Sequence, residues 1–270
     1  MEISKYAGRI IDTHAHVYPD KIASKAVQAI SDFYSIPMVG GNGSLTELMQ
    51  RGAKNGIGRF VIHSLATTPH QVQAINNFIL GCADTSNSLI PFMTLHPSQT
   101  EEEMRAELDR VIPLGMKGVK LHPDFQKFKV DDEESRKIYE AIDGRLPILF
   151  HAGDNRYDFS GPRRIANVAK MYPRQTIIAA HFGGYRQWDD VEVYRGLENV
   201  VFDTCSSLAF ITPERAYEIM KELGFSRFMF ASDYPMWNYE EELVRFSRLP
   251  LDEKQTEDVL FRNAERLLGL

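Results

Sequence analysis

Two histidines stand two residues apart at the end of the apolar run IIDTHAHVYP (residues 10–19). In an extended strand alternate side chains share a face, so Asp12, His14 and His16 project to the same side. Neutral imidazole nitrogens are common ligands of Zn²⁺ and similar divalent ions. The spacing therefore predicts that His14 and His16 bind one metal ion together at the end of a strand.

Most of the other histidines also close apolar runs. Seven of the eight histidines fall at or near such ends, and the exception is His70; the seven are His14, His16, His63, His96, His122, His151 and His181. Asp233 closes the last run, although an acid there could instead cap the segment DYPMWNYEE that follows. Imidazoles and a carboxylate on one rim are the ligand set of a catalytic divalent metal. For His63 and His96 we expect only hydrogen bonding beneath a loop.

The elements that must position these side chains are visible as repeated apolar runs separated by segments with helical spacing. Eight candidate strands occur, at residues 9–16, 59–66, 89–97, 115–123, 146–153, 175–184, 199–206 and 227–235. Strand and helix in alternation predict a parallel sheet, and this number of units in this length predicts a (β/α)8 TIM barrel with its site at the C-terminal ends of the strands. A doubly wound open sheet is the alternative, but it calls for a glycine-rich phosphate loop, and THAHVYPD contains no glycine.

Local signals set the expected helix boundaries. Ser44 and Glu47 form a capping-box pattern, Pro69 suits a first helical turn, and Gly224 suits a helix end. The glycines of IPMVGGNGS (36–44) predict a flexible loop that could act as a lid. Because no linker interrupts the series, we expect a single domain over residues 1–270.

Composition narrows the classes of partner. The 270 residues are 43% hydrophobic and 25% charged, with a net charge of −6, so nucleic acid is not expected to bind. The N-terminus MEISKYAGRI lacks the apolar core of a signal peptide, and no apolar run is long enough to cross a membrane. We therefore expect a cytoplasmic protein. Cys82 and Cys205 have neither the spacing of a metal site nor the number needed for a disulfide framework.

The order of these motifs resembles that of a known family. HxH on the first run is followed by single histidines that close the fifth and sixth runs, in the motifs HAG and AHFGG. An acid closes the eighth run in the motif ASDYP. The motif GVKLHP and the closing segment VLFRNAERLLGL belong to the same pattern. This pattern resembles the amidohydrolase superfamily, and more closely its amidohydrolase-related branch, which includes aminocarboxymuconate-semialdehyde decarboxylase, resorcylate-type decarboxylases and several hydrolases. The resemblance spans nearly the whole chain.

The resemblance implies roles for individual residues. His14, His16 and His151 would bind one divalent metal, for which we expect Zn²⁺, and Asp233 would be a further ligand or the base for metal-bound water. His181 would act as an acid or base beside the metal. Simple coordination chemistry agrees, because three neutral ligands leave Zn²⁺ its charge and can lower the pKa of a bound water to about 7.

Several cations point to an acidic small-molecule substrate. We expect Lys120 and His122, which share parity on the fourth run, and Arg156 and Arg186, in the loops after the fifth and sixth runs, to bind it. Each of these residues has an alternative role. In binuclear members of the superfamily a carboxylated lysine on this strand bridges two metals, so Lys120 could do the same, or it could pair with an acid. Arg156 and Arg186 could instead form surface ion pairs. Arg163 and Arg164 are expected on the next helix.

Three functions compete. The leading prediction is a metal-dependent hydrolase that opens an amide, ester or lactone in a small carboxylate-bearing compound, using metal-activated water. The alternative is a metal-dependent non-oxidative decarboxylase of an unsaturated or aromatic acid, which would use the same ligands. A barrel that binds metal without catalysis is the third, and the open ligand set argues against it. A homodimer is one assembly that the sequence allows.

Overall fold

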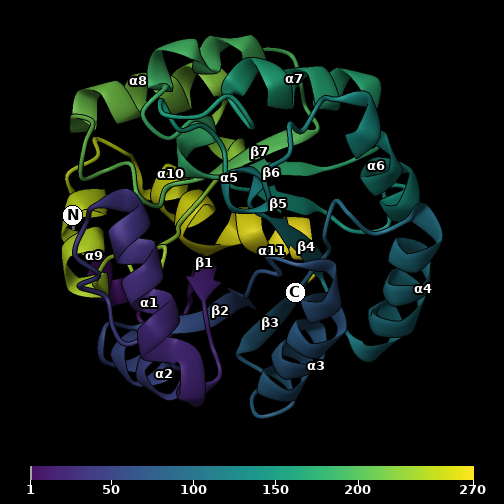
Figure 1. Ribbon diagram of the computed structural model, residues 1–270. Coiled ribbons are helices and arrows are strands. Elements are labelled where there is room, and N and C mark those ends of the chain that lie inside the picture. Colours follow the sequence, from purple (N-terminus) through teal and green to yellow (C-terminus); the bar gives the residue numbers. More distant parts are fainter. Residues whose placement is uncertain (1) are drawn as a thin grey trace. The chain divides into compact units, whose positions relative to one another are not determined.

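The structure, a computed structural model, describes residues 2–270. Eight strands form one sheet in which each strand neighbours the next along the chain, from β1 to β8 (Figure 1). The strands are β1 Ile10–His16, β2 Ile57–His63, β3 Leu89–Thr94, β4 Gly118–Leu121, β5 Ile148–Phe150, β6 Ile177–Ala179, β7 Val200–Asp203 and β8 Phe228–Met229. This order of strands with helices between them confirms the predicted (β/α)8 barrel. All eight strands fall within the predicted runs or within two residues of them.

Helices separate the strands along the chain. They are α1 Asp20–Tyr34, α2 Leu45–Lys54, α3 Val72–Ala83, α4 Glu101–Val111, α5 Pro123–Gln126, α6 Arg136–Ile142, α7 Pro162–Met171, α8 Pro213–Leu223, α9 Tyr239–Ser247, α10 Glu253–Glu257 and α11 Asn263–Leu268. Ser44 caps α2 by accepting a hydrogen bond from the backbone N–H of Glu47 at 3.2 Å, and Gly224, with φ +99°, is the C-cap that follows α8. No helix formed by residues 2–270 has the length and apolar character needed to span a membrane.

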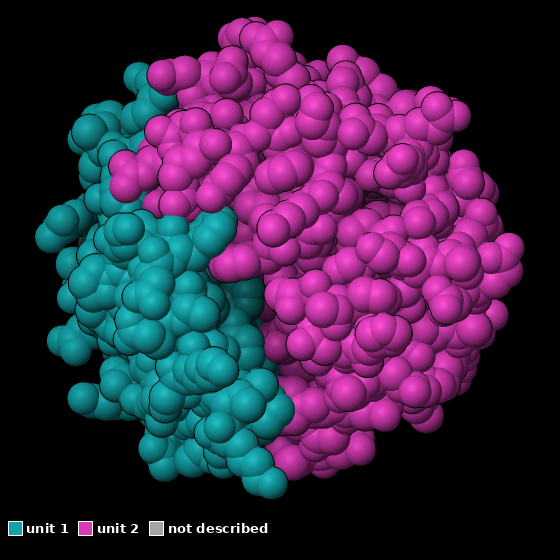
Figure 2. Space-filling view, viewed as in Figure 1, with its two compact units in different colours: residues 1–62, 86–90, 204–270 teal, residues 63–85, 91–203 magenta. Residues whose placement is uncertain are grey.

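The chain divides into two compact units, which Figure 2 colours separately. Unit 1 comprises residues 1–62, 86–90 and 204–270, and unit 2 comprises residues 63–85 and 91–203. The expectation of one domain over the whole chain stays a prediction.

The strands β4, β5, β6 and β7 lie wholly in unit 2, and their pairing aligns their ends. Lys120 of β4 is paired with Leu149 of β5, which is paired with Ile178 of β6. The backbone N–H of His151 also donates to the carbonyl of Leu121 at 3.0 Å, just past the strands. The strand side chains are buried, as expected for strands covered on both faces. This register places the residues that follow β4, β5 and β6 at the same edge of the sheet.

Unit 1 joins the first and last strands. β8 is shorter than the predicted run 227–235, yet the residues beyond it continue alongside β1: Thr13 N–H donates to the carbonyl of Phe230 at 3.0 Å, and Asp233 N–H donates to that of His14, also at 3.0 Å. This pairing brings Asp233 to the histidines of β1.

The loop 36–44 is anchored rather than free, which corrects the prediction of a flexible lid. Val39 N–H donates to the carbonyl of Met236 at 3.1 Å, and Gly40 N–H donates to that of Pro235 at 2.9 Å. A Cβ at Gly40 would lie 2.1 Å from the carbonyl oxygen of Trp237. Gly40 therefore allows two backbone segments to approach closely. A glycine in a loop can have this role or can make the loop flexible, and the sequence pattern is the same in both cases.

Candidate active site

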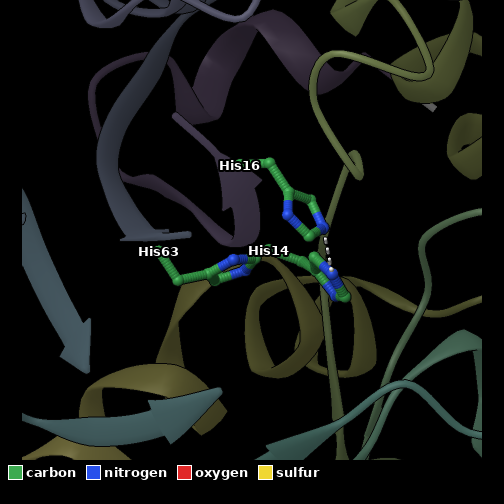
Figure 3. Close-up of side chains that lie close together, drawn as sticks. All are labelled: His14, His16 and His63. Carbon is green, nitrogen blue, oxygen red and sulfur yellow. Dashed lines mark hydrogen bonds between the residues drawn. The ribbon is translucent and has the colours of Figure 1, made fainter. Parts of the chain in front are cut away.

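The two histidines of the HxH motif face each other in unit 1. The Nε2 atoms of His14 and His16 are 3.3 Å apart, and their rings are tilted by 45° (Figure 3, which also labels His63 at the end of β2). Oδ1 of Asp233 lies 3.5 Å from Nε2 of His14 and 3.4 Å from Nε2 of His16. Three ligand atoms from two chain segments thus lie at nearly equal separations.

This arrangement fits a divalent metal. Ligand atoms about 2.0–2.1 Å from a tetrahedral Zn²⁺ lie about 3.3–3.4 Å from one another, close to the three distances seen here. Two imidazole lone pairs and a carboxylate oxygen that converge on one point would repel one another unless a cation or protons lay between them. Nitrogen and oxygen donors suit Zn²⁺ and Mn²⁺ alike, so the donor set does not select between these ions.

Asp12 holds the backbone of His14 by a hydrogen bond instead of joining His14 and His16 as a third ligand. It is fully buried, its Oδ1 accepts the backbone N–H of His14 at 3.1 Å, and its Oδ2 accepts the hydroxyls of Ser232 and Tyr239, each at 2.6 Å. Burial raises the pKa of Asp12 to about 6, although these hydrogen bonds oppose the shift. The carboxylate therefore ties β1 to residue 232, one position before Asp233.

Two further residues of unit 1 touch the proposed ligands. Sγ of Cys205 lies 3.4 Å from Nδ1 of His14, and Oγ of Ser206 lies 2.5 Å from Oδ2 of Asp233. Sequence reasoning missed both residues, because Cys205 was judged only by its spacing from Cys82. Their position directly after the run NVVFD was the available signal.

Unit 2 holds a second buried cluster with different geometry. Nε2 of His181 lies 2.9 Å from Nδ1 of His151, and Nε2 of His151 lies 3.2 Å from Oδ2 of Asp124. The ring of His122 stacks on that of His151 with centroids 4.0 Å apart and planes 6° from parallel. Lone pairs of imidazole lie in the ring plane, so two parallel stacked rings cannot both direct theirs at one ion. Although His122, Asp124 and His151 are close enough for a metal, their arrangement suits proton handling better.

The backbone around His181 fixes this side chain. His181 has φ +62°, its N–H donates to Oδ1 of Asp203 at 2.8 Å, and its carbonyl accepts the indole N–H of Trp188 at 3.0 Å. The ring of Tyr185 packs edge-on against that of His181, with centroids 5.8 Å apart. The sequence analysis also missed Asp124 and Asp203, because it considered mainly the histidines at the strand ends and not these two acids.

The residues predicted to bind substrate have different surroundings. Lys120 is wholly buried in β4, and Arg186 is exposed, with its guanidinium 5.5 Å from the ring centroid of Tyr185. Arg156 is engaged with buried Asp154 through Nε, 3.0 Å from Oδ1, and Nη2, 2.7 Å from Oδ2. Burial alone would raise the pKa of Asp154, but the hydrogen bonds from Arg156 hold it below its usual range.

Two expectations for other residues agree with the structure. Arg163 and Arg164 lie in α7, as predicted. Nδ1 of His96 accepts the backbone N–H of Ser98 at 3.1 Å, which is the hydrogen-bonding role expected beneath a loop. Burial also lowers the pKa of His96, so the neutral ring is favoured.

Comparison with known proteins adds a family and a set of similar structures. The profile described as amidohydrolase matches residues 11–270. No curated protein sequence gives a significant match. Among solved structures, 5-carboxyvanillate decarboxylase from Sphingomonas paucimobilis is similar with a TM-score of 0.77 and 16% identity, covering 97% of this chain and 99% of its own.

Two further decarboxylases are similar and contain manganese. A dihydroxybenzoic acid decarboxylase from Polaromonas, solved with manganese and 2-nitroresorcinol, has a TM-score of 0.75 and 15% identity, covering 97% of both chains. A 5-carboxyvanillate decarboxylase from Novosphingobium aromaticivorans, solved with manganese and 4-hydroxy-3-methoxy-5-nitrobenzoic acid, has a TM-score of 0.72 and 14% identity, covering 97% of this chain and 96% of its own. At these identities the likeness shows the fold.

These neighbours contradict our leading prediction of a hydrolase. The similar structures whose activity is named are mostly decarboxylases of carboxylated phenols, which favours the alternative. The ligand residues could not reveal this, because hydrolysis and decarboxylation use the same set. The clusters of candidate ligands and the metal in the similar structures support the prediction of a divalent metal. The metal in those structures is manganese, so zinc stays a prediction.

Proposed function

Because this chain belongs to the amidohydrolase family, as the match over residues 11–270 shows, we propose that it is a metal-dependent non-oxidative decarboxylase of a small unsaturated or aromatic acid. The observation that carries the proposal is the convergence of Nε2 of His14, Nε2 of His16 and Oδ1 of Asp233 within 3.3–3.5 Å of one another. The decarboxylase activity of the structural neighbours supports the choice of reaction.

We assign the cation to the residues of unit 1. His14, His16 and Asp233 would hold one divalent ion, Mn²⁺ or Zn²⁺. The family resemblance also implied His151 as a ligand, but its two ring nitrogens lie 2.9 Å from Nε2 of His181 and 3.2 Å from Oδ2 of Asp124, so we assign His151 to proton transfer instead. A divalent ion held there would supply positive charge that offsets the substrate's carboxylate and the negative charge that develops on the substrate as CO₂ leaves. Asp124, 3.2 Å from Nε2 of His151, would orient the ring of His151 so that its Nδ1 faces His181.

The reaction also needs a proton. When the C–C bond to the carboxylate breaks, its electron pair stays on the substrate carbon, CO₂ departs, and a proton forms the new C–H bond. We assign this proton to Nδ1 of His181, whose Nε2 lies 2.9 Å from Nδ1 of His151. Asp203 keeps the backbone of His181 in place by accepting its N–H at 2.8 Å.

The substrate is a small acid. We assign its polar groups to Lys120, His122 and Arg186. Arg156 forms an ion pair with Asp154, so we do not assign it to the substrate. The edge-on pair of Tyr185 and Trp188, with centroids 6.2 Å apart, supplies apolar surface in the loop that follows His181. An aromatic or unsaturated acid matches this combination of cations and rings.

The test is direct. Protein loaded with Mn²⁺ or Zn²⁺ is incubated with hydroxybenzoates and unsaturated carboxylates, and released CO₂ is measured together with deuterium uptake from D₂O at the vacated carbon. We expect equimolar CO₂ and deuterated product, with no turnover after chelation. The variant His70→Ala, which changes the one histidine away from the strand ends, is the matched control. Turnover of lactones or amides without CO₂ release would refute the proposal.

A further inference from the structure

The turn after β7 contains a serine that contacts one of the proposed metal ligands. Oγ of Ser206 lies 2.5 Å from Oδ2 of Asp233, and the indole Nε1 of Trp237 lies 2.9 Å from the same Oγ. Ser206 is 2% exposed and has φ +50°, a conformation uncommon for residues other than glycine. All three residues belong to unit 1. A strained, buried serine between an acid and an indole calls for an explanation.

The direction of these hydrogen bonds follows from donor chemistry. An indole N–H only donates, so Trp237 donates to Oγ of Ser206. The hydroxyl has a single proton, and its other neighbours are the Asp233 carboxylate and Sδ of Met236 at 3.2 Å. A carboxylate is a much stronger acceptor than a thioether, so the hydroxyl donates to Oδ2 of Asp233. The chain of donors therefore runs in one direction, from Trp237 through Ser206 to Asp233.

This chain separates the two oxygens of the carboxylate. Oδ2 is committed to Ser206, and Oδ1 faces Nε2 of His14 and Nε2 of His16 at 3.5 and 3.4 Å. Without the hydroxyl, the carboxylate could rotate or offer both oxygens to an ion. Trp237 is itself braced, because the guanidinium of Arg245 lies 4.9 Å from its ring centroid and Phe210 packs edge-on against it at 5.8 Å.

We propose that Ser206, held by Trp237, is a positioning residue that makes Asp233 a one-oxygen ligand and thereby sets the affinity and coordination number of the metal centre. This inference rests on the proposed metal ligands but not on the reaction catalysed. Outer hydrogen-bond partners of metal ligands typically contribute 10- to 100-fold in affinity.

The experiment compares Ser206→Ala with Ser207→Ala. Ser207 is a buried neighbour whose hydroxyl donates only to the carbonyl of Cys205, at 3.1 Å, so its removal controls for the loss of a buried serine at this turn. Mn²⁺ dissociation constants are measured by calorimetry, and the coordination number is monitored by the visible absorption of the Co²⁺-loaded proteins. We expect Ser206→Ala to bind Mn²⁺ about 10- to 100-fold more weakly and to show weaker Co²⁺ absorption, as the carboxylate adds its second oxygen. Ser207→Ala should match the wild type.

A second variant keeps the proposal testable if Ser206→Ala fails to fold. Trp237→Phe retains an aromatic ring and removes only the donor to Ser206, so it should weaken Mn²⁺ binding less than Ser206→Ala while shifting the Co²⁺ spectrum in the same direction. Wild-type affinity and an unchanged spectrum in the folded Ser206 variant, or in Trp237→Phe where that variant alone folds, would overturn the positioning role. Equal losses in Ser207→Ala would also overturn it. Wild-type protein that binds Mn²⁺ but releases no CO₂ would refute only the proposed reaction.

Discussion

The two buried clusters contain the same residue types and differ in how the imidazole rings are turned. In unit 1 the rings of His14 and His16 are tilted by 45°, and their Nε2 atoms face each other and a carboxylate oxygen. In unit 2 the ring of His122 lies parallel to that of His151, whose Nδ1 faces another imidazole. Converging lone pairs suit a cation, whereas a stacked and linearly linked pair suits a proton. Composition therefore identifies a reactive cluster, and ring orientation assigns its chemistry.

The largest expected effect tests the unit 1 cluster. His14→Ala or His16→Ala removes one of two facing nitrogens, so the affinity for Mn²⁺ should fall by more than about 100-fold, beyond the range of outer partners, and turnover should be lost. Elemental analysis after dialysis measures the metal content. His70→Ala should retain it. If either variant kept the wild-type metal content, the assignment of the metal to the unit 1 cluster would be wrong.

The next effect tests the unit 2 cluster. His181→Asn keeps a polar side chain and removes the proton carrier, so kcat should fall by about 10²- to 10⁴-fold. Metal content should stay at the wild-type level, since His181 is assigned to proton transfer. The two quantities are measured on the same preparation by single-turnover assay and elemental analysis. Loss of metal in step with activity would show that the two clusters do not have separate roles.

A smaller effect is expected at the acid beside His151. Asp124→Asn preserves shape and removes the charge 3.2 Å from Nε2 of His151, so kcat should fall by about 10-fold, the lower range for partners that orient a functional histidine. The exposed neighbour Asp132→Asn, also in unit 2, is the control and should behave as wild type. An unaltered kcat in Asp124→Asn would remove this acid from the proton pathway.

The smallest effect concerns a buried acid near the unit 1 cluster. Burial raises the pKa of Glu242 to about 7, and the nearby charge of Asp233 adds to the shift. The folded state then binds more protons than the unfolded state between about pH 4.5 and 7. The free energy of unfolding should therefore fall as pH rises through this window, by on the order of 1–3 kcal/mol.

Glu242→Gln should flatten that part of the pH profile, while Glu241→Gln, at an exposed neighbour, should leave it unchanged. Urea unfolding at several pH values measures the difference. Parallel profiles for the wild type and Glu242→Gln would mean that the carboxylate is not held in its neutral form by the fold.

The sequence predicted the strands well because parallel strands that are covered on both faces appear as short apolar runs. It also predicted the residues that close those runs, since strand ends follow directly from the runs. The supporting residues could not be predicted in this way. Ser206 lies in a turn with positive φ and contacts Asp233, 27 positions away, so neither its conformation nor its partner is visible in local spacing. The reaction type could not be predicted either, because hydrolases and decarboxylases of this kind use the same metal ligands.

The contact at Gly40 has an evolutionary consequence. Its backbone and that of residues 235–237 approach so closely that a methyl group on Gly40 would collide with the carbonyl oxygen of Trp237 at 2.1 Å. A side chain at residue 40 would require the backbone of residues 235–237 to move. We therefore expect position 40 to vary less among related proteins than positions in loops that lack such a contact.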